Sequence, residues 1–239
     1  MGENLLVLTT AGRLKWLERA IETLRDPLDV LVVDDATPSD VGIGDFCKTK
    51  GLKFLTRPKA KGLTHSWNAA YWFFRENRYK KCILSNDDVK FPKGFSNGLL
   101  GGLEKFDLVG PVSNRPGHGI AQKVKEFTAV SVTEDNMDQV QEALLQKYSE
   151  TPLVEHGFVN GFCFAFSTTV QEFMFSDELL FNPAKRNIGN EGDLIRRMNE
   201  QGGKIGFCRT SYVWHAKSGT YRELPLSTRL NRDALWTHQ

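Results

Sequence analysis

The first half of the chain alternates short apolar runs with segments of helical periodicity. The continuous runs at 5–8, 30–33, 52–55 and 82–84 are typical of strands that are buried on both faces of a parallel sheet. Between them, apolar residues recur at helical spacing, and a helix at 93–105 followed by a strand at 108–110 continues the alternation. This order predicts right-handed βαβ units and therefore an α/β fold with a doubly wound, mostly parallel central sheet.

The pattern changes after Pro111, where a Gly-, Pro- and Asn-rich stretch at 113–122 indicates a loop. An apolar segment at 154–166 is interrupted by Gly157 and Gly161, which suggests strands that bend around a site. The other predicted elements of this half are a strand at 126–132, an amphipathic helix at 135–148, a helix at 193–201, and two short strands at 205–208 and 212–215. The polar, arginine-bearing residues 221–239 are predicted to form a tail or lid.

Composition narrows the classes of protein. The 239 residues suffice for one compact unit, and a net charge of +2 without a Lys/Arg block does not favour nucleic acid as a partner. The four scattered cysteines indicate buried thiols in a reducing compartment, so we expect a cytoplasmic protein without disulfides. No signal peptide or transmembrane segment is evident, while peripheral contact with a membrane and the oligomeric state stay open.

Acidic side chains follow two of the predicted strands. Asp34 and Asp35 end the second strand, and Asn86, Asp87 and Asp88 end the fourth. The carboxyl ends of neighbouring strands converge in a doubly wound sheet, and acids gathered there repel one another unless a cation offsets their charge. A divalent metal with a phosphate-bearing ligand explains the cluster economically, whereas the alternative is that the acids only cap turns and helix N-termini.

The same choice applies to three polar residues further along the chain. Glu191 and Asp193 fit either a catalytic site or the N-terminus of a helix, where acids complement the dipole. His215 follows an apolar strand and would complete a metal site, although a lone histidine is more often structural.

Six motifs in this order resemble those of the family 2 glycosyltransferases of the GT-A fold. The motifs are residues 8–13, 32–40, Gly62 with 68–69, 86–89 with Pro92, 190–194 and 214–215, and the resemblance runs from Leu5 to about Gly219. It implies a single GT-A domain at 1–220, with a Rossmann-like nucleotide-sugar-binding half at 1–112 and a smaller mixed acceptor-side sheet in a catalytic half at 113–220. The implied activity is inverting, metal-dependent transfer of a sugar from a nucleoside-diphosphate sugar to a hydroxyl of a glycan, lipid-linked or protein acceptor.

The resemblance also implies residue roles at the donor side. Asp35 would read the edge of the base, which suits a UDP-sugar first and a dTDP-sugar second. Asp88 would be the principal ligand of Mn²⁺ or Mg²⁺, and Asp87 and His215 would be further ligands. The residues expected around the nucleotide and its phosphates are Thr9, Ala11, Arg13, Lys61, Asn68, Asn86 and Asp87, with Arg57 as an alternative to Lys61.

On the acceptor side, Glu191 matches the general base of the family, and Asp193 follows it in the same catalytic segment. Phe158, Asn160 and Gly161 are expected to border the acceptor. The sequence departs from the commonest family pattern at Ser85 or Asn86, where an acid is usual, and at Ser66-Trp67, where an arginine is usual. The altered regions at Ser85/Asn86 and Lys61 leave open a non-catalytic carbohydrate-binding module on the same fold. A nucleotidyltransferase that forms sugar nucleotides, which shares the sheet and the metal chemistry, is the other alternative, although no glycine-rich nucleotidyltransferase loop follows the first strand.

Overall fold

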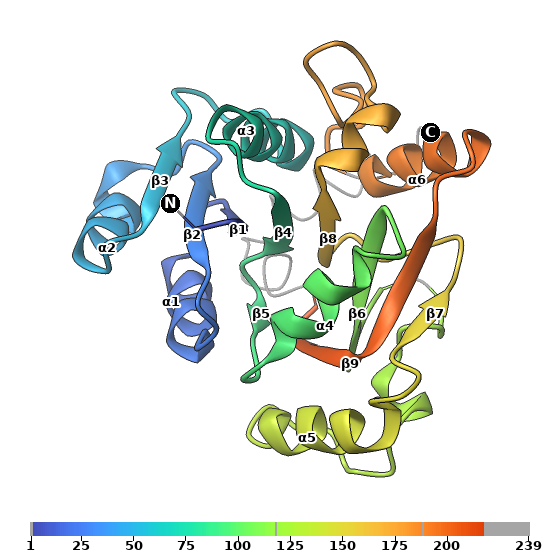
Figure 1. Cartoon of the computed structure of the whole chain (residues 1–239). Coiled ribbons are helices and arrows are strands. Elements are labelled where there is room, and N and C mark those ends of the chain that lie inside the picture. The colour runs from blue at the N-terminus through green and yellow to red at the C-terminus, as the bar shows by residue number, and fades with distance from the viewer. Residues whose placement is uncertain (1, 118, 188, 218–239) are drawn as a thin grey trace, which may run out of the picture.

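The centre of the molecule is a mixed sheet of nine strands (Figure 1). The computed structural model describes residues 2–117, 119–187 and 189–217. Along the sheet the strands follow the order β3-β2-β1-β4-β8-β6-β9-β5, and β7 pairs with β9 outside this path. The strands are β1 Asn4–Thr10, β2 Asp29–Asp34, β3 Lys53–Thr56, β4 Lys81–Asn86, β5 Val89–Lys90, β6 Leu108–Ser113, β7 Leu153–Glu155, β8 Cys163–Ser167 and β9 Ile205–His215.

Helices cover both faces of the sheet, because successive strand residues point to opposite sides. On one face, Leu5, Val7 and Leu84 pack with apolar residues of α3 and α6. On the other face, Leu6 and Leu8 pack with α1, α2 and α4, while α5 closes a third cluster against β6 and β9. The helices are α1 Leu14–Thr23, α2 Ile43–Thr49, α3 Leu63–Glu76, α4 Phe95–Gly102, α5 Met137–Tyr148 and α6 Asn190–Glu200.

The parallel half of the sheet follows the predicted βαβ order. β1 lies between β2 and β4 and is parallel to both, so Thr10 aligns with Asp34 and Thr9 with Asn86. The carboxyl ends of these strands therefore meet at one edge, as the sequence predicts. Beyond β4 the sheet becomes mixed, because β8 is antiparallel to both β4 and β6.

Two predictions for the second half are wrong. Residues 126–132 do not form a strand: apart from a 3-10 turn at Val124–Glu126 they are irregular, and Phe127, Val130 and Val132 pack from this loop against the cluster under α5. The two strands predicted at 205–208 and 212–215 are one continuous strand, β9, with a register shift opposite Pro111 and Val112.

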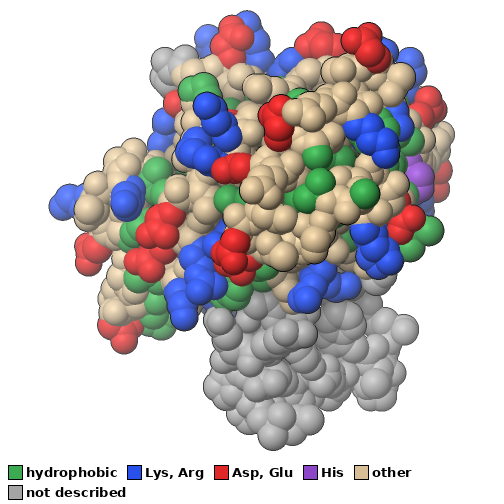
Figure 2. All heavy atoms as spheres, turned by 90° about the horizontal axis from the view of Figure 1, so that it is seen from below, with side chains coloured by type: hydrophobic (Ala, Val, Ile, Leu, Met, Phe, Trp, Pro, Cys, Tyr) green, Lys and Arg blue, Asp and Glu red, His purple; other side chains and the backbone are tan. Residues whose placement is uncertain are grey.

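The cysteines, the helices and the surface bear on the remaining expectations from the sequence. All four cysteines are free and buried. In the part of the chain that the structure describes, no helix is long and apolar enough to cross a membrane. Acidic and basic side chains are interspersed on the coloured face in Figure 2. The predicted tail or lid at 221–239 lies outside the described residues.

Candidate active site

Two adjacent aspartates at the end of β2 have different tasks. Asp34 is buried and holds its own turn, since its carboxylate accepts the Thr37 backbone N–H at 2.9 Å and the Thr56 hydroxyl at 3.1 Å. Asp35 reaches across to the start of α3, where Lys61 N and Gly62 N donate to its two oxygens at 2.9 and 2.8 Å. Each oxygen of Asp35 retains a lone pair for a further donor.

Asp35 lines a cavity of about 410 Å³ at the carboxyl ends of β1, β2 and β4. Its lining residues are Thr9, Thr10, Ala11, Arg13, Asp35, Ala60, Gly62, Leu63, Ser66, Asn86, Arg186 and Asn187. The structure thus brings together five of the residues expected around a nucleotide, namely Thr9, Ala11, Arg13, Asp35 and Asn86.

Four other expected residues are not among those that line this cavity, namely Lys61 and its alternative Arg57, Asn68 and Asp87. Lys61 contributes its backbone N–H to Asp35, and neither it nor Arg57 belongs to the lining. Asn68 is buried on α3, where its amide nitrogen donates to Phe181 O at 2.8 Å and its oxygen accepts Phe181 N–H at 2.9 Å. The side chain of Asn68 therefore fixes the segment before α6.

The structure adds two residues that the sequence argument missed, Arg186 and Asn187. This segment lies against the N-terminus of α3, where Arg186 O accepts Thr64 N–H at 3.1 Å and Asn187 Oδ1 accepts Leu63 N–H at 3.1 Å. Gly62, at φ +94, permits the approach, because a Cβ there would lie 2.5 Å from Asn187 Oδ1. The available signal was the basic pair Lys185-Arg186 directly ahead of the Asn190-Glu191 motif.

Asp87 is completely buried and forms an ion pair and hydrogen bond with Arg13. Burial raises the pKa of Asp87 to about 6, against the opposing effect of the Arg13 charge. Arg13 keeps two buried nitrogens, Nε and Nη1, without a hydrogen-bond partner. Nη1 lies 3.9 Å from Asp88 Oδ2, so Arg13, at the wall of the cavity that contains Asp35, forms an ion pair with Asp88 as well.

Asp88 faces His215, because β5 pairs with the end of β9 and aligns Val89 with His215. The His215 Nε2 and Asp88 Oδ1 atoms are 3.5 Å apart, and both side chains are almost fully buried. Burial works to raise the pKa of Asp88, but the neighbouring His215 ring, together with the charge of Arg13, holds that pKa below its usual value. Asp88 Oδ1 has no hydrogen-bond partner within the described structure.

The surroundings of His215 fix which ring nitrogen is available. Nδ1 lies 2.7 Å from the carbonyl oxygen of Arg115, which only accepts, so Nδ1 carries a proton. Nε2 is the nitrogen that faces Asp88, and in the neutral ring its lone pair is available to a cation. The ring also stacks on Phe162, with centroids 4.8 Å apart. A carboxylate oxygen without a partner beside an imidazole lone pair fits a divalent cation. The described residues contain no group of three or more His, Cys, Asp or Glu that would hold a metal by themselves.

Glu191 lines a second cavity, of about 380 Å³, which contains His215 and the three residues expected at the acceptor, Phe158, Asn160 and Gly161. The Glu191 carboxylate lies close to Gly161, where a Cβ would come within 2.8 Å of the Glu191 Cδ. This cavity shares Asn86, Leu63 and Asn187 with the cavity of Asp35. The two cavities therefore meet at the end of β4.

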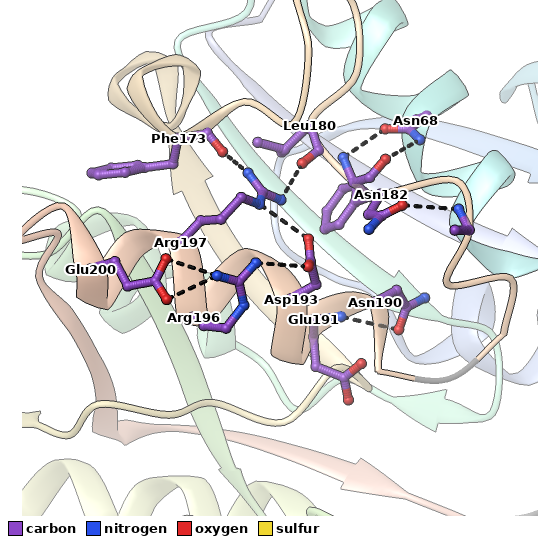
Figure 3. A network of polar contacts seen from close by, with 12 residues as sticks. Asn68, Phe173, Leu180, Asn182, Asn190, Glu191, Asp193, Arg196, Arg197 and Glu200 are labelled. Carbon is purple, nitrogen blue, oxygen red and sulfur yellow. Dashed lines mark hydrogen bonds and ion pairs between the residues drawn. The ribbon is translucent and has the colours of Figure 1, made fainter. Parts of the chain in front are cut away.

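Asp193 lies on the same helix but is engaged in ion pairs (Figure 3). Its oxygens accept from Arg197 Nε at 3.1 Å and from Arg196 Nη2 at 3.3 Å. Arg197 in turn donates to the carbonyls of Phe173 and Leu180. In Figure 3 the Glu191 carboxylate points away from this network and forms no contact with it. The two acids of the first turn of α6 thus have separate surroundings.

Comparison with solved structures identifies the fold. No protein-family model matches the sequence, and no curated protein matches it either. A structure of GalNAc-T7 determined with UDP, GalNAc and Mn²⁺ matches 89% of this chain with a TM-score of 0.65 at 12% identity. A structure of TarS from S. aureus matches 95% of it with a TM-score of 0.56 at 14% identity.

Both comparison chains are longer, and this chain spans 43% of the first and 41% of the second. They have the GT-A glycosyltransferase fold, so the match confirms the α/β fold class that the sequence predicts. At these identities the match establishes the fold and leaves activity to be argued from the site.

Proposed function

We propose that this protein is an inverting, metal-dependent glycosyltransferase that moves a sugar from a nucleoside-diphosphate sugar to an acceptor hydroxyl. One observation carries the proposal: a cavity with Asp35 and a cavity with Glu191 share Asn86, next to the facing pair Asp88 and His215. Transfer between two substrates needs two such adjoining sites with charge stabilisation at their junction. Family 2 membership remains part of this proposal.

The donor occupies the cavity of Asp35 in this proposal. A free lone pair on each Asp35 oxygen suits the N3–H that uracil and thymine share, so the donor is a UDP-sugar in first place and a dTDP-sugar in second. The presence of UDP in the comparison structure of GalNAc-T7 agrees with this choice. Arg13 and Arg186 line the same cavity and would donate to phosphate oxygens.

Asp88 and His215 would hold Mn²⁺ or Mg²⁺, and the Mn²⁺ in the GalNAc-T7 structure agrees with such a cofactor. The bound cation would supply positive charge that stabilises the departing nucleoside diphosphate. Arg13 neutralises Asp87 behind this pair, which keeps a second buried carboxylate from repelling the phosphates.

Glu191 would act as the general base. Its carboxylate lines the acceptor cavity and makes no hydrogen bond to another described residue, so it is available to take the proton of an acceptor hydroxyl. The hydroxyl oxygen then forms a bond to the anomeric carbon as the bond from that carbon to the diphosphate oxygen breaks. Attack from the face opposite the leaving group inverts the configuration.

The test combines binding with donor turnover. Calorimetry should detect UDP binding that depends on Mn²⁺, and Asp88→Ala should abolish this dependence while Asp45→Ala, an exposed control on α2, should not. Glu191→Gln should retain UDP binding but lose transfer by at least about a hundredfold, the contribution expected of a general base. Glu200→Gln on the same helix is its control.

The outcomes separate the competing functions. Slow Mn²⁺-dependent release of UDP from UDP-sugars by the wild type supports a transferase. Binding of UDP-sugars without any release would favour a non-catalytic carbohydrate-binding module, and formation of a sugar nucleotide from UTP and a sugar phosphate would favour a nucleotidyltransferase. Full transfer by Glu191→Gln would refute the role of the base.

We further infer a cytoplasmic location, which the four free, buried thiols support. Fractionation of cells that express the protein, with free-thiol counting in each fraction, tests this location.

A further inference from the structure

Three basic side chains line a further cavity of about 340 Å³, which adjoins the cavity of Glu191 and a larger cavity of about 780 Å³. They are Arg115, Lys123 and Lys217, and the backbone of Gly117 and Gly119 completes the wall. This grouping was not evident in the sequence, because Lys217 follows β9 and is far along the chain from Arg115 and Lys123, which both lie in the loop after β6.

The three charges have no acidic partner among the described residues. Arg115 Nη1 donates to the carbonyl of Ala216 at 3.3 Å, and Lys217 Nζ donates to the carbonyl of Gly117 at 3.4 Å. Such bonds orient the cations without neutralising them. Elsewhere on the described surface, basic residues at strand ends do find acids, as in the pairs of Lys53 with Asp29 and of Lys81 with Glu104.

The position of this cavity assigns it to one side of the proposed reaction. It shares Pro116 and Gly117 with the cavity of Glu191, and it shares no lining residue with the cavity of Asp35. The backbone of Arg115 also holds His215 in place through the bond to Nδ1. The cations are therefore neighbours of the acceptor side.

We propose that Arg115, Lys123 and Lys217 form a subsite for an oxyanion carried by the acceptor, such as a phosphate group. Three cations that lie together without acids, two of them already oriented by backbone carbonyls, match the several oxygens of a phosphate through charge-assisted hydrogen bonds. The assignment to the acceptor rests on the proposed glycosyltransferase function. It narrows the acceptor to an anionic, phosphate-bearing class.

The test uses glycerol 3-phosphate and its uncharged counterpart glycerol as probes. Each is titrated into ¹⁵N-labelled protein saturated with UDP and Mg²⁺, and amide shifts are followed by NMR. Glycerol 3-phosphate should shift the amides of Gly117 and Gly119 and bind at least about tenfold more tightly than glycerol, as expected for charge-assisted bonds. A wild type that binds both probes equally would overturn the proposal.

Variants locate the effect. The triple variant Arg115→Gln/Lys123→Gln/Lys217→Gln should lose the preference for the phosphate. Lys48→Gln/Lys50→Gln/Lys105→Gln, with the same change in charge at exposed positions, should keep it. Equal losses in both triple variants would overturn the subsite. If the first triple variant does not fold, the single variant Lys123→Gln replaces it, because the Lys123 side chain makes no hydrogen bond to a described residue. Glycerol 3-phosphate bound by Lys123→Gln as tightly as by the wild type would also overturn the subsite.

Calorimetry of UDP with Mg²⁺ distinguishes this proposal from the one on which it rests. The first triple variant should bind UDP as the wild type does, and a loss of UDP affinity would assign the cations to the donor diphosphate and refute the acceptor assignment. If the wild type does not bind UDP but prefers glycerol 3-phosphate through these residues, the anion site stands and the glycosyltransferase proposal fails.

Discussion

Asp193 and Glu191 occupy the same turn of α6, and the structure predicts that replacing them has opposite consequences. Asp193→Ala removes the carboxylate that faces Arg197, and the side chains of the two residues are only 9% and 11% exposed. Arg197 would then keep a buried positive charge without its counter-charge. The other donors of Arg197 stay bonded to the carbonyls of Phe173 and Leu180, which reduces the loss of stability.

The magnitude follows from that geometry. Removing one partner of a buried ion pair costs about 3–5 kcal/mol, and the two retained carbonyl bonds favour the lower end, about 3 kcal/mol. For a chain of this length, that loss lowers Tm by roughly 6–12 °C. Urea unfolding followed by tryptophan fluorescence gives the free energy of unfolding, and calorimetry gives Tm.

Two variants on the same helix are the controls. Glu200→Ala removes only the exposed pair with Arg196 and should change stability little. Glu191→Gln breaks no hydrogen bond or ion pair of the network in Figure 3, so it should unfold as the wild type does and yet lose transfer. If Asp193→Ala unfolded like the wild type but lost transfer, Asp193 would act in catalysis, and its assignment to the stability of α6 would be refuted.

Two further changes test the acceptor wall and the folding of the parallel half. Gly161→Ala places a Cβ 2.8 Å from the Glu191 Cδ, so transfer should fall at least about tenfold while UDP affinity in calorimetry is unchanged. Gly192→Ala, which has open space around its Cβ, is the control. An equal loss of transfer in both variants would contradict a steric effect on Glu191. The Tyr79 hydroxyl donates to Asp29 at 2.6 Å and lowers the pKa of Asp29. The bond therefore adds to the free energy of unfolding above the pKa that Asp29 has in the unfolded chain, and this stabilisation is lost as pH falls through the pKa of Asp29 in the folded protein. Tyr79→Phe should therefore cost about 1–2 kcal/mol in urea unfolding at pH 7 and less at pH 3, whereas an equal cost at both pH values would exclude this linkage.

The parallel half of the fold was predictable because each strand there is a continuous apolar run buried on both faces. The second half was harder, since apolar content does not distinguish a strand from a loop that covers a core. Phe127 and Val130 belong to such a loop. At β9 the polar residues led to the opposite error, a predicted break in a continuous strand. Ser211 is buried inside this strand, and its hydroxyl donates to Phe95 O at 2.5 Å.

The site could be predicted where strand ends set the geometry and not where tertiary contacts did. The alignment of Thr9 with Asn86 follows from the parallel pairing of β1 and β4. By contrast, local sequence gives Asp87 and Asp88 the same character, and only the packing of Arg13, 74 residues away, buries one against a cation while the other faces His215. The sequence therefore predicts that Asp87 and Asp88 belong to the site, but it does not predict which of them pairs with Arg13 and which faces His215.

The segment before β8 joins both proposed substrates to one rigid support. Phe162 O accepts the Asn86 backbone N–H at 2.9 Å, and the Phe162 ring stacks on His215. Its neighbour Gly161 lies against Glu191. A short antiparallel strand between β4 and β6 thus fixes the junction of the cavities, the imidazole and the carboxylate from a single turn of chain. Because well-packed elements resist small displacements, the place of β8 between β4 and β6 holds this turn in position, and a shift of the turn would disturb both cavities together.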